Sequence, residues 1–210
     1  IIAVADIPAT FGGAARHNVE NALAAAAACF IHEVPIETIR AGLATFDASF
    51  ATSPGRLNVR DAGGVTIVMD FAHNADGLSR VAPVLASLPI KGKRVALLAR
   101  TRTRSNPQQY KEYGVQAAGM FDRFFLAEKT KDQSKWPPGE VARMVIGGLE
   151  SAGVPNNAIH QANSVDEALE AAFSVVRPGD LLFVAAFHEA EMWQRLESFC
   201  PALPAVETVG

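Results

Sequence analysis

Cysteine is scarce in this sequence. The 210 residues include two cysteines, Cys29 and Cys200, and no Cys-x-x-Cys spacing. Each lies within or at the end of an apolar segment that favours helix, which argues against a disulfide framework and against a cysteine-rich zinc site. We therefore expect two buried thiols in a reducing compartment, the cytoplasm.

Long hydrophobic runs and an excess of basic residues are also missing. The most apolar stretch, NALAAAAACFI, is shorter than the roughly 20 residues of a membrane span, so we expect a buried helix and no membrane partner. The formal net charge is −3, from 19 basic and 22 acidic residues. This balance argues against nucleic acid as the main partner.

Two phosphate-binding signatures are absent as well. No GxxxxGK[ST] loop occurs, and TFGGAARHN lacks the GxGxxG spacing of dinucleotide sites. The chain opens with IIAVADIP, with neither a methionine nor a basic leader, so we expect an excised fragment. Without a P-loop, such a fragment is expected to bind nucleotide weakly and to catalyse nothing alone.

What is present is a change of pattern near residue 50. Residues 16–31 strongly favour helix, and PIETIRAGLATF begins a second helix with a proline suited to a first turn. The following DASFATSPGR has the small residues, proline and glycine of a linker. We predict a helical piece over 1–46, a linker over 47–56 and a larger domain over 57–210.

In that larger domain, apolar runs typical of strands alternate with segments typical of helices. Strands are predicted over 64–71, 93–99, 122–127, 157–161 and 180–187, and helices over 77–88, 107–119, 138–151, 164–176 and 189–199. Runs such as VTIVMDF and DLLFVAAF are apolar almost throughout, as strands covered on both faces must be. The alternation predicts an α/β fold, a mostly parallel sheet with helices on both faces.

Polar side chains end the first of these predicted strands. Asp70, His73 and Asn74 directly follow VTIVM, at the carboxyl end of a strand, where open α/β sheets bind their ligands. A second interpretation stays open for Asn74 and Asp76, because either could cap the helix that begins near Leu78. Capping explains Asp70 and His73 less well.

Two amides and a guanidinium add to these candidates. Asn18 and Asn21 are three residues apart, so on a helix they point to one side, and each amide offers the donor and acceptor that a purine edge requires. Alternatively, Asn18 caps a helix and Asn21 is solvated. Arg56 follows Pro54 and Gly55 in the predicted linker, where a guanidinium can close over a phosphate or remain solvated.

Weaker candidates follow two other predicted strands. Arg100, Arg102 and Arg104 alternate in ARTRTRSN and would project to one side of an extended chain, which suits an anionic ligand as well as it suits a solvated loop. His188 and Glu189 follow the last strand, where a carboxylate is favoured at the start of a helix.

Taken together and in this order, RHNVENALAAAAA, PGRLN and DFAHNADGL resemble the Mur ligase superfamily of ATP-dependent amide ligases. The resemblance covers nearly the whole chain. It implies that 1–46 is the end of the central ATPase domain, 47–56 a hinge, and 57–210 a Rossmann-like C-terminal domain. Within the superfamily, IPATFGGAARHNVENALAAAAACF and FATSPGRLNV are most similar to the cyanophycin synthetase family.

The resemblance also implies roles for the matching residues. Asn18 and Asn21 would meet the adenine of ATP, Asp70 the ribose hydroxyls and Arg56 the phosphates, with His73 as the catalytic residue near the phosphates. Mg²⁺ would neutralise the phosphates. The implied reaction phosphorylates a substrate carboxylate, and an amine then attacks the acyl phosphate, which adds an amino acid to an acidic peptide.

The remaining expectations concern substrates and partners. Asn74 is expected to assist in ATP binding, and Arg102 and Arg104 in binding a small-molecule or peptide substrate, while no residue is assigned as a metal ligand. ARTRTRSN stands where cyanophycin synthetases carry a glycine-rich loop, so the amine need not be arginine. The apolar N-terminal helix also leads us to expect association into a homo-oligomer.

Three alternatives stay open at this point. One is a non-catalytic nucleotide-binding or scaffold module derived from a Mur ligase. The others are a peptidoglycan Mur ligase and a relative of folylpolyglutamate synthase, both of which share the Asp-x-Ala-His type of segment or close variants.

Overall fold

A six-stranded sheet forms the centre of the chain from residue 58 onward. The computed structural model describes residues 1–99, 106–128, 136–185 and 189–199. The strand order is β1-β2-β6-β3-β4-β5. The bounds are Asn58–Ala62 for β1, Val65–Asp70 for β2, Arg94–Ala99 for β3, Arg123–Ala127 for β4, Ile159–Ala162 for β5 and Leu181–Ala185 for β6.

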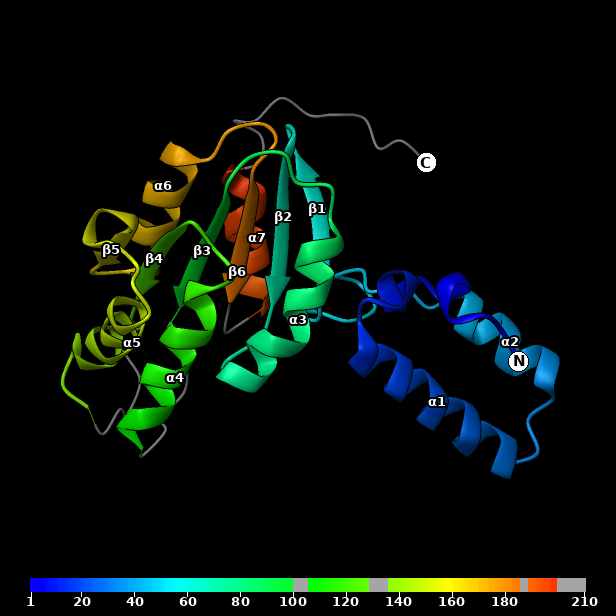
Figure 1. Cartoon of the computed structure of the whole chain (residues 1–210). Coiled ribbons are helices and arrows are strands. Elements are labelled where there is room, and N and C mark those ends of the chain that lie inside the picture. The colour runs from blue at the N-terminus through cyan, green and yellow to red at the C-terminus, as the bar shows by residue number, and fades with distance from the viewer. Residues whose placement is uncertain (100–105, 129–135, 186–188, 200–210) are drawn as a thin grey trace.

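Every neighbouring pair in this sheet is parallel except the first. Strands β2, β6, β3, β4 and β5 pair in parallel, so their carboxyl ends lie at one edge, as Figure 1 shows. Strand β1 pairs antiparallel with β2, with Asn58 opposite Met69 and Ala62 opposite Val65. The start of β1 therefore lies beside the end of β2.

Helices cover both faces of the sheet. Helices α3 (Ala75–Ser87), α4 (Pro107–Ala118) and α5 (Glu140–Ser151) contribute to one apolar cluster, and α6 (Val165–Val175) and α7 (Glu189–Phe199) to the other. Successive strand residues enter opposite clusters, as in β6, where Phe183 packs with the first and Val184 with the second. This alternation is why the strands are apolar almost throughout.

A smaller helical part precedes the sheet. It consists of two short 3-10 helices, η1 (Val4–Asp6) and η2 (Pro8–Gly13), followed by α1 (Arg16–Ile31) and α2 (Ile36–Thr45). Figure 1 shows this part, in blue, standing away from the sheet. It touches the sheet domain through Ala15, which is fully buried in the first apolar cluster, and through an ion pair between Glu20 and Arg80 of α3, 3.6 Å apart.

The predicted fold class is confirmed: the described part of the chain is α/β, with a mostly parallel sheet. The predicted strands and helices match the observed ones to within a few residues, although residues 186–187 of the last predicted strand lie outside the described residues. Strand β1 was not predicted, because its sequence NVRDA is short and includes Arg60 and Asp61. The domain limits at 47–56 stay a prediction.

No helix in the described part of the chain combines the length and the apolar character that crossing a bilayer requires.

Candidate functional site

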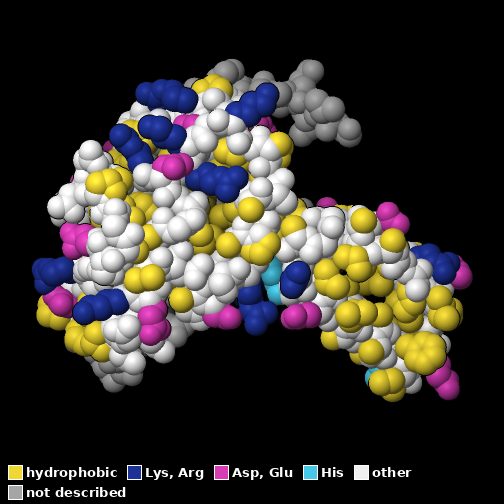
Figure 2. Space-filling model, in the orientation of Figure 1, with side chains coloured by type: hydrophobic (Ala, Val, Ile, Leu, Met, Phe, Trp, Pro, Cys, Tyr) yellow, Lys and Arg dark blue, Asp and Glu magenta, His cyan; other side chains and the backbone are white. Residues whose placement is uncertain are grey.

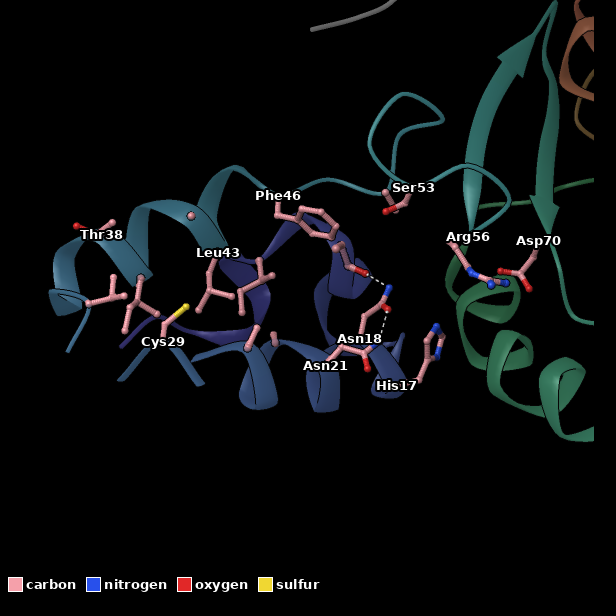
Figure 3. A pocket seen from close by; sticks show the side chains of 18 residues that line it. His17, Asn18, Asn21, Cys29, Thr38, Leu43, Phe46, Ser53, Arg56 and Asp70 are labelled. Carbon is pink, nitrogen blue, oxygen red and sulfur yellow. Dashed lines mark hydrogen bonds between the residues drawn. The ribbon is translucent and has the colours of Figure 1, made fainter. Parts of the chain in front are cut away.

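A pocket of about 720 Å³ lies where the helical part meets the carboxyl end of β2. Figure 3 shows an apolar end between α1 and α2, with Cys29 and Leu43, and a polar end at the junction with the sheet domain. The polar end brings together side chains from distant parts of the sequence: His17, Asn18 and Asn21 from α1, and Arg56 and Asp70.

Asp70 is the last residue of β2 and is held firmly in place. Its Oδ2 accepts a hydrogen bond from the Leu57 amide at 2.9 Å and its Oδ1 accepts one from the Ala72 amide at 2.7 Å. Burial raises the pKa of Asp70, and the two backbone hydrogen bonds and Arg56 oppose that rise. A carboxylate oxygen can accept two hydrogen bonds, and each oxygen of Asp70 accepts one from these amides, so Asp70 retains capacity for a ligand hydroxyl.

Arg56 reaches the same space from the linker. Its guanidinium lies over the Phe71 ring, 5.0 Å from the centroid, and Figure 3 shows it pointing toward the Asp70 carboxylate. The preceding Gly55 has φ +69, and a Cβ there would lie 2.3 Å from Cγ of Glu189 at the start of α7. Glycine is therefore required for the linker to pass α7 and present Arg56.

Asn18 and Asn21 both line the pocket, as their spacing on a helix predicts. Asn18 Nδ2 donates to the Ala9 carbonyl at 2.7 Å, and Asn21 Nδ2 makes a long hydrogen bond of 3.4 Å to Asn18 Oδ1. Asn18 does not cap α1, whose N-cap is Ala15. The amide oxygen of Asn21 accepts no hydrogen bond from the described residues, so it is available to a ligand.

The other two residues of the strand-end motif lie outside the pocket wall. Asn74 caps α3, since its Oδ1 accepts a hydrogen bond from the Gly77 amide at 2.6 Å, as the capping interpretation predicted. His73 packs against Phe71, with ring centroids 4.7 Å apart. The nucleotide role of Asn74 and the catalytic role of His73 stay predictions.

Four of the residues named from the sequence cannot be placed. They are Arg100, Arg102, Arg104 and His188, which lie outside the described residues. Glu189 is described and forms the first residue of α7, against Gly55.

Sequence reasoning missed three residues that shape this site. His17 lines the pocket beside Asn18. Tyr113 of α4 donates from its buried hydroxyl to the Ala72 carbonyl at 2.9 Å, and Asn58 fastens the linker to the sheet through hydrogen bonds to Ala48, Ser53 and Gly55. A buried tyrosine in an amphipathic helix is ordinary, so no sequence signal marks Tyr113.

The polar end of the pocket suits a nucleotide better than it suits a metal ion bound by protein alone. Amides, a guanidinium and a buried carboxylate can hold a base, phosphates and a sugar, and the cavity is within the usual size range of ligand sites. In contrast, the described residues contain no group of three or more His, Cys, Asp and Glu side chains able to hold a metal. They do not by themselves form a magnesium site.

A family model described as "Mur ligase, glutamate ligase domain" matches residues 55–187, which is more than half of the chain. The chain belongs to this family. The resemblance to the C-terminal part of the Mur ligases is thereby confirmed. The chain is also 33% identical over 143 residues to the cyanophycin synthetase of Nostoc sp. (strain PCC 7120 / SAG 25.82 / UTEX 2576), across 68% of this chain.

Solved structures of MurF and FolC share the fold. MurF from Acinetobacter baumannii has a TM-score of 0.66 at 21% identity, over 87% of this chain and 38% of that one. FolC from E. coli, solved in complex with ADP, has a TM-score of 0.56 at 18% identity, over 79% of this chain and 35% of that one. The chain spans 16% of the length of the cyanophycin synthetase and well under half of these structures.

Proposed function

We propose that this chain is the C-terminal part of an ATP-dependent carboxylate–amine ligase. The reaction joins an amino acid to an acidic peptide, as in cyanophycin synthesis, by way of a phosphorylated carboxylate. The single observation that carries the proposal is the convergence of Arg56 and Asp70 on one pocket, although one comes from the linker and the other from a strand end. The ADP bound to the related FolC supports a nucleotide as the ligand.

In this proposal each polar residue at the junction has a distinct task. Asn18 and Asn21 bind the adenine, Asp70 holds the ribose hydroxyls and Arg56 neutralises phosphate charge. His73 and Asn74 act from the turn after β2. ATP, when bound, supplies the phosphoryl group that activates the substrate carboxylate.

The proposal assigns the division of the chain as well. Residues 1–46 are the end of the central ATPase domain, 47–56 the hinge, and 57–210 the C-terminal domain, so residues 1–210 alone are inactive. Within the polar end of the pocket, the two asparagines precede the hinge, Arg56 is its last residue and Asp70 follows it. Closure would bring them to one nucleotide and keep water from the activated carboxylate. Arg102 and Arg104 are proposed to bind the substrate.

The test is ATP-dependent amide formation by the full-length protein, with the product mass measured after incubation with each acceptor and amino acid. We expect Asp70→Ala to reduce turnover at least a hundredfold, and the control Asp166→Ala, an exposed acid of α6 paired with Arg195, to leave it unchanged.

Unchanged turnover in Asp70→Ala contradicts the proposal. Nucleotide binding without any product favours the non-catalytic scaffold instead, and the mass of the product separates cyanophycin-like, peptidoglycan and folylpolyglutamate chemistry.

A further inference from the structure

His17 occupies the centre of the polar end of the pocket. It lies in the first turn of α1, and Figure 3 shows its ring between the two asparagines on one side and Arg56 and Asp70 on the other. Three charged groups from both parts of the chain act on the ring electrostatically. They are Glu20 of its own helix, Asp70 of β2 and Arg80 of α3.

One nitrogen of this ring is left without a partner. His17 Nδ1 is buried and makes no hydrogen bond to any described residue. A buried polar atom without a partner is costly, and native proteins keep few of them. Burial also lowers the pKa of His17, an effect that Arg80 strengthens and that Asp70 and Glu20 oppose, so the ring is neutral at pH 7.

The position of the proton on the neutral ring follows from this environment. A buried N–H without an acceptor is rarer in proteins than a buried acceptor without a donor. The proton is therefore placed on Nε2, which leaves Nδ1 as the unpaired acceptor. His17 then presents an Nε2–H donor at the pocket wall, between the residues proposed to bind the base and the sugar.

We propose that His17 is a further nucleotide-binding residue, whose Nε2–H donates a hydrogen bond to an oxygen of the ribose–phosphate portion. This inference rests on the proposed function, because it takes the ligand of the pocket to be ATP. A hydrogen bond within the protein does not account for the imidazole, since neither ring nitrogen makes one to a described residue.

The experiment compares four substitutions in the full-length protein by titration with the non-hydrolysable analogue AMP-PNP. Glutamine carries an N–H near the position of histidine Nε2, asparagine carries one near Nδ1, and methionine carries none. We expect the His17→Met and His17→Asn variants to bind AMP-PNP about tenfold more weakly than wild type, because each loses one hydrogen bond to a charged ligand. The affinity of His17→Gln is expected to stay within about threefold of wild type. His32→Ala, an exposed histidine at the other end of α1, is the matched control and is expected to bind normally.

Thermal unfolding separates binding from folding. Because Nδ1 has no partner, His17→Met is expected to unfold at the same temperature as wild type or higher, while its affinity falls. Adenosine, which lacks phosphates, identifies the atom contacted: an equal loss with adenosine assigns the ribose, and a loss confined to AMP-PNP assigns a phosphate.

The inference is overturned if His17→Met binds AMP-PNP as wild type does, or if His17→Asn retains affinity while His17→Gln loses it. These outcomes are distinct from failure of the proposed function. A wild-type protein that binds no AMP-PNP removes the proposed function, whereas a wild-type protein that binds it and a His17→Met variant that binds equally well remove only the role of His17.

Discussion

At the scale of single residues, a short hydrogen-bond relay, made of two hydrogen bonds to the backbone of Ala72, positions Asp70. The Ala72 amide donates to Asp70 Oδ1, and the carbonyl of the same residue accepts a hydrogen bond from the Tyr113 hydroxyl. Tyr113 is completely buried, and this burial raises the pKa of its hydroxyl, so it stays protonated and remains a donor at any pH the protein tolerates. Tyr113 of α4 thereby restrains the backbone next to Asp70, the residue proposed to bind the ribose.

This relay predicts the effect of Tyr113→Phe. Removing the hydroxyl leaves the buried Ala72 carbonyl without its donor, which is expected to lower the free energy of unfolding by about 1–2 kcal/mol and to weaken AMP-PNP binding severalfold. Urea unfolding and titration of the full-length protein measure the two effects. Tyr110→Phe removes a hydroxyl from another buried tyrosine of the same helix and is expected to leave nucleotide affinity unchanged. Equal affinities in Tyr113→Phe and wild type would show that the relay does not position Asp70.

Only those residues of this site that are unusual in their local sequence could be predicted. An acid directly after the apolar run VTIVM is unusual, and Asp70 is indeed a pocket residue. Asn18 and Asn21 stood out because polar amides precede an alanine-rich helix at helical spacing. Tyr113 and His17 could not be recognised, because their roles depend on contacts between segments that are distant in the chain.

At the scale of elements, the linker is attached to the sheet domain over much of its length. Asn58, buried at the start of β1, accepts from the Gly55 amide at 2.7 Å and donates to the carbonyls of Ala48 and Ser53 at 2.8 and 2.9 Å. Phe50 stacks on Trp193 of α7, with centroids 4.6 Å apart. A rotation of the helical part is therefore expected to occur near residues 46–47, at the upstream end of the predicted hinge.

Asn58→Ala tests this attachment. The substitution removes three hydrogen bonds in a buried setting and is expected to cost about 2–3 kcal/mol of unfolding free energy. It is also expected to speed amide hydrogen exchange of residues 48–55 relative to the rest of the sheet domain. Asn156→Ala, at an exposed asparagine before β5, serves as the control. Slow exchange of 48–55 in the Asn58→Ala variant would mean that other contacts hold the linker.

The elements that the sequence predicted correctly are those with a strong pattern of their own. Strands β2, β3, β4 and β6 are apolar because both of their faces are covered, and the amphipathic helices between them carry one apolar face each. Strand β1 lacks such a pattern, since it lies at an edge and its central residues face solvent. Only its pairing with β2 makes it a strand.

At the scale of the whole molecule, the helical part exposes apolar surface. Leu23, Phe30 and Ile31 of α1 are 66%, 62% and 77% exposed, and Figure 2 shows hydrophobic side chains gathered on this part. An apolar face of this kind favours association. The homo-oligomer stays a prediction, and we expect it to form mainly through residues 1–46.

This exposed apolar surface predicts that the chain with residues 1–46 and the chain without them differ in dye binding and in association. Residues 1–210 are expected to bind the dye ANS and to associate as concentration rises, and residues 47–210 are expected to do neither to the same extent. Fluorescence and sedimentation velocity measure these properties, with the triple variant Leu23→Lys, Phe30→Lys, Ile31→Lys as the matched control in the longer chain. Equal ANS binding by residues 1–210 and residues 47–210 would place the exposed apolar surface in the sheet domain.

The tight turn at Gly63 and Gly64 acts on the pocket from the opposite edge of the sheet. Asn58 is the first of the five β1 residues paired with β2, so it lies five strand steps, roughly 17 Å, from Gly63. A shift of this register by one residue would turn Asn58 to the other face of the sheet and move Arg56 away from Asp70. The register between β1 and β2 therefore decides whether Arg56 and Asp70 can contact the same ligand.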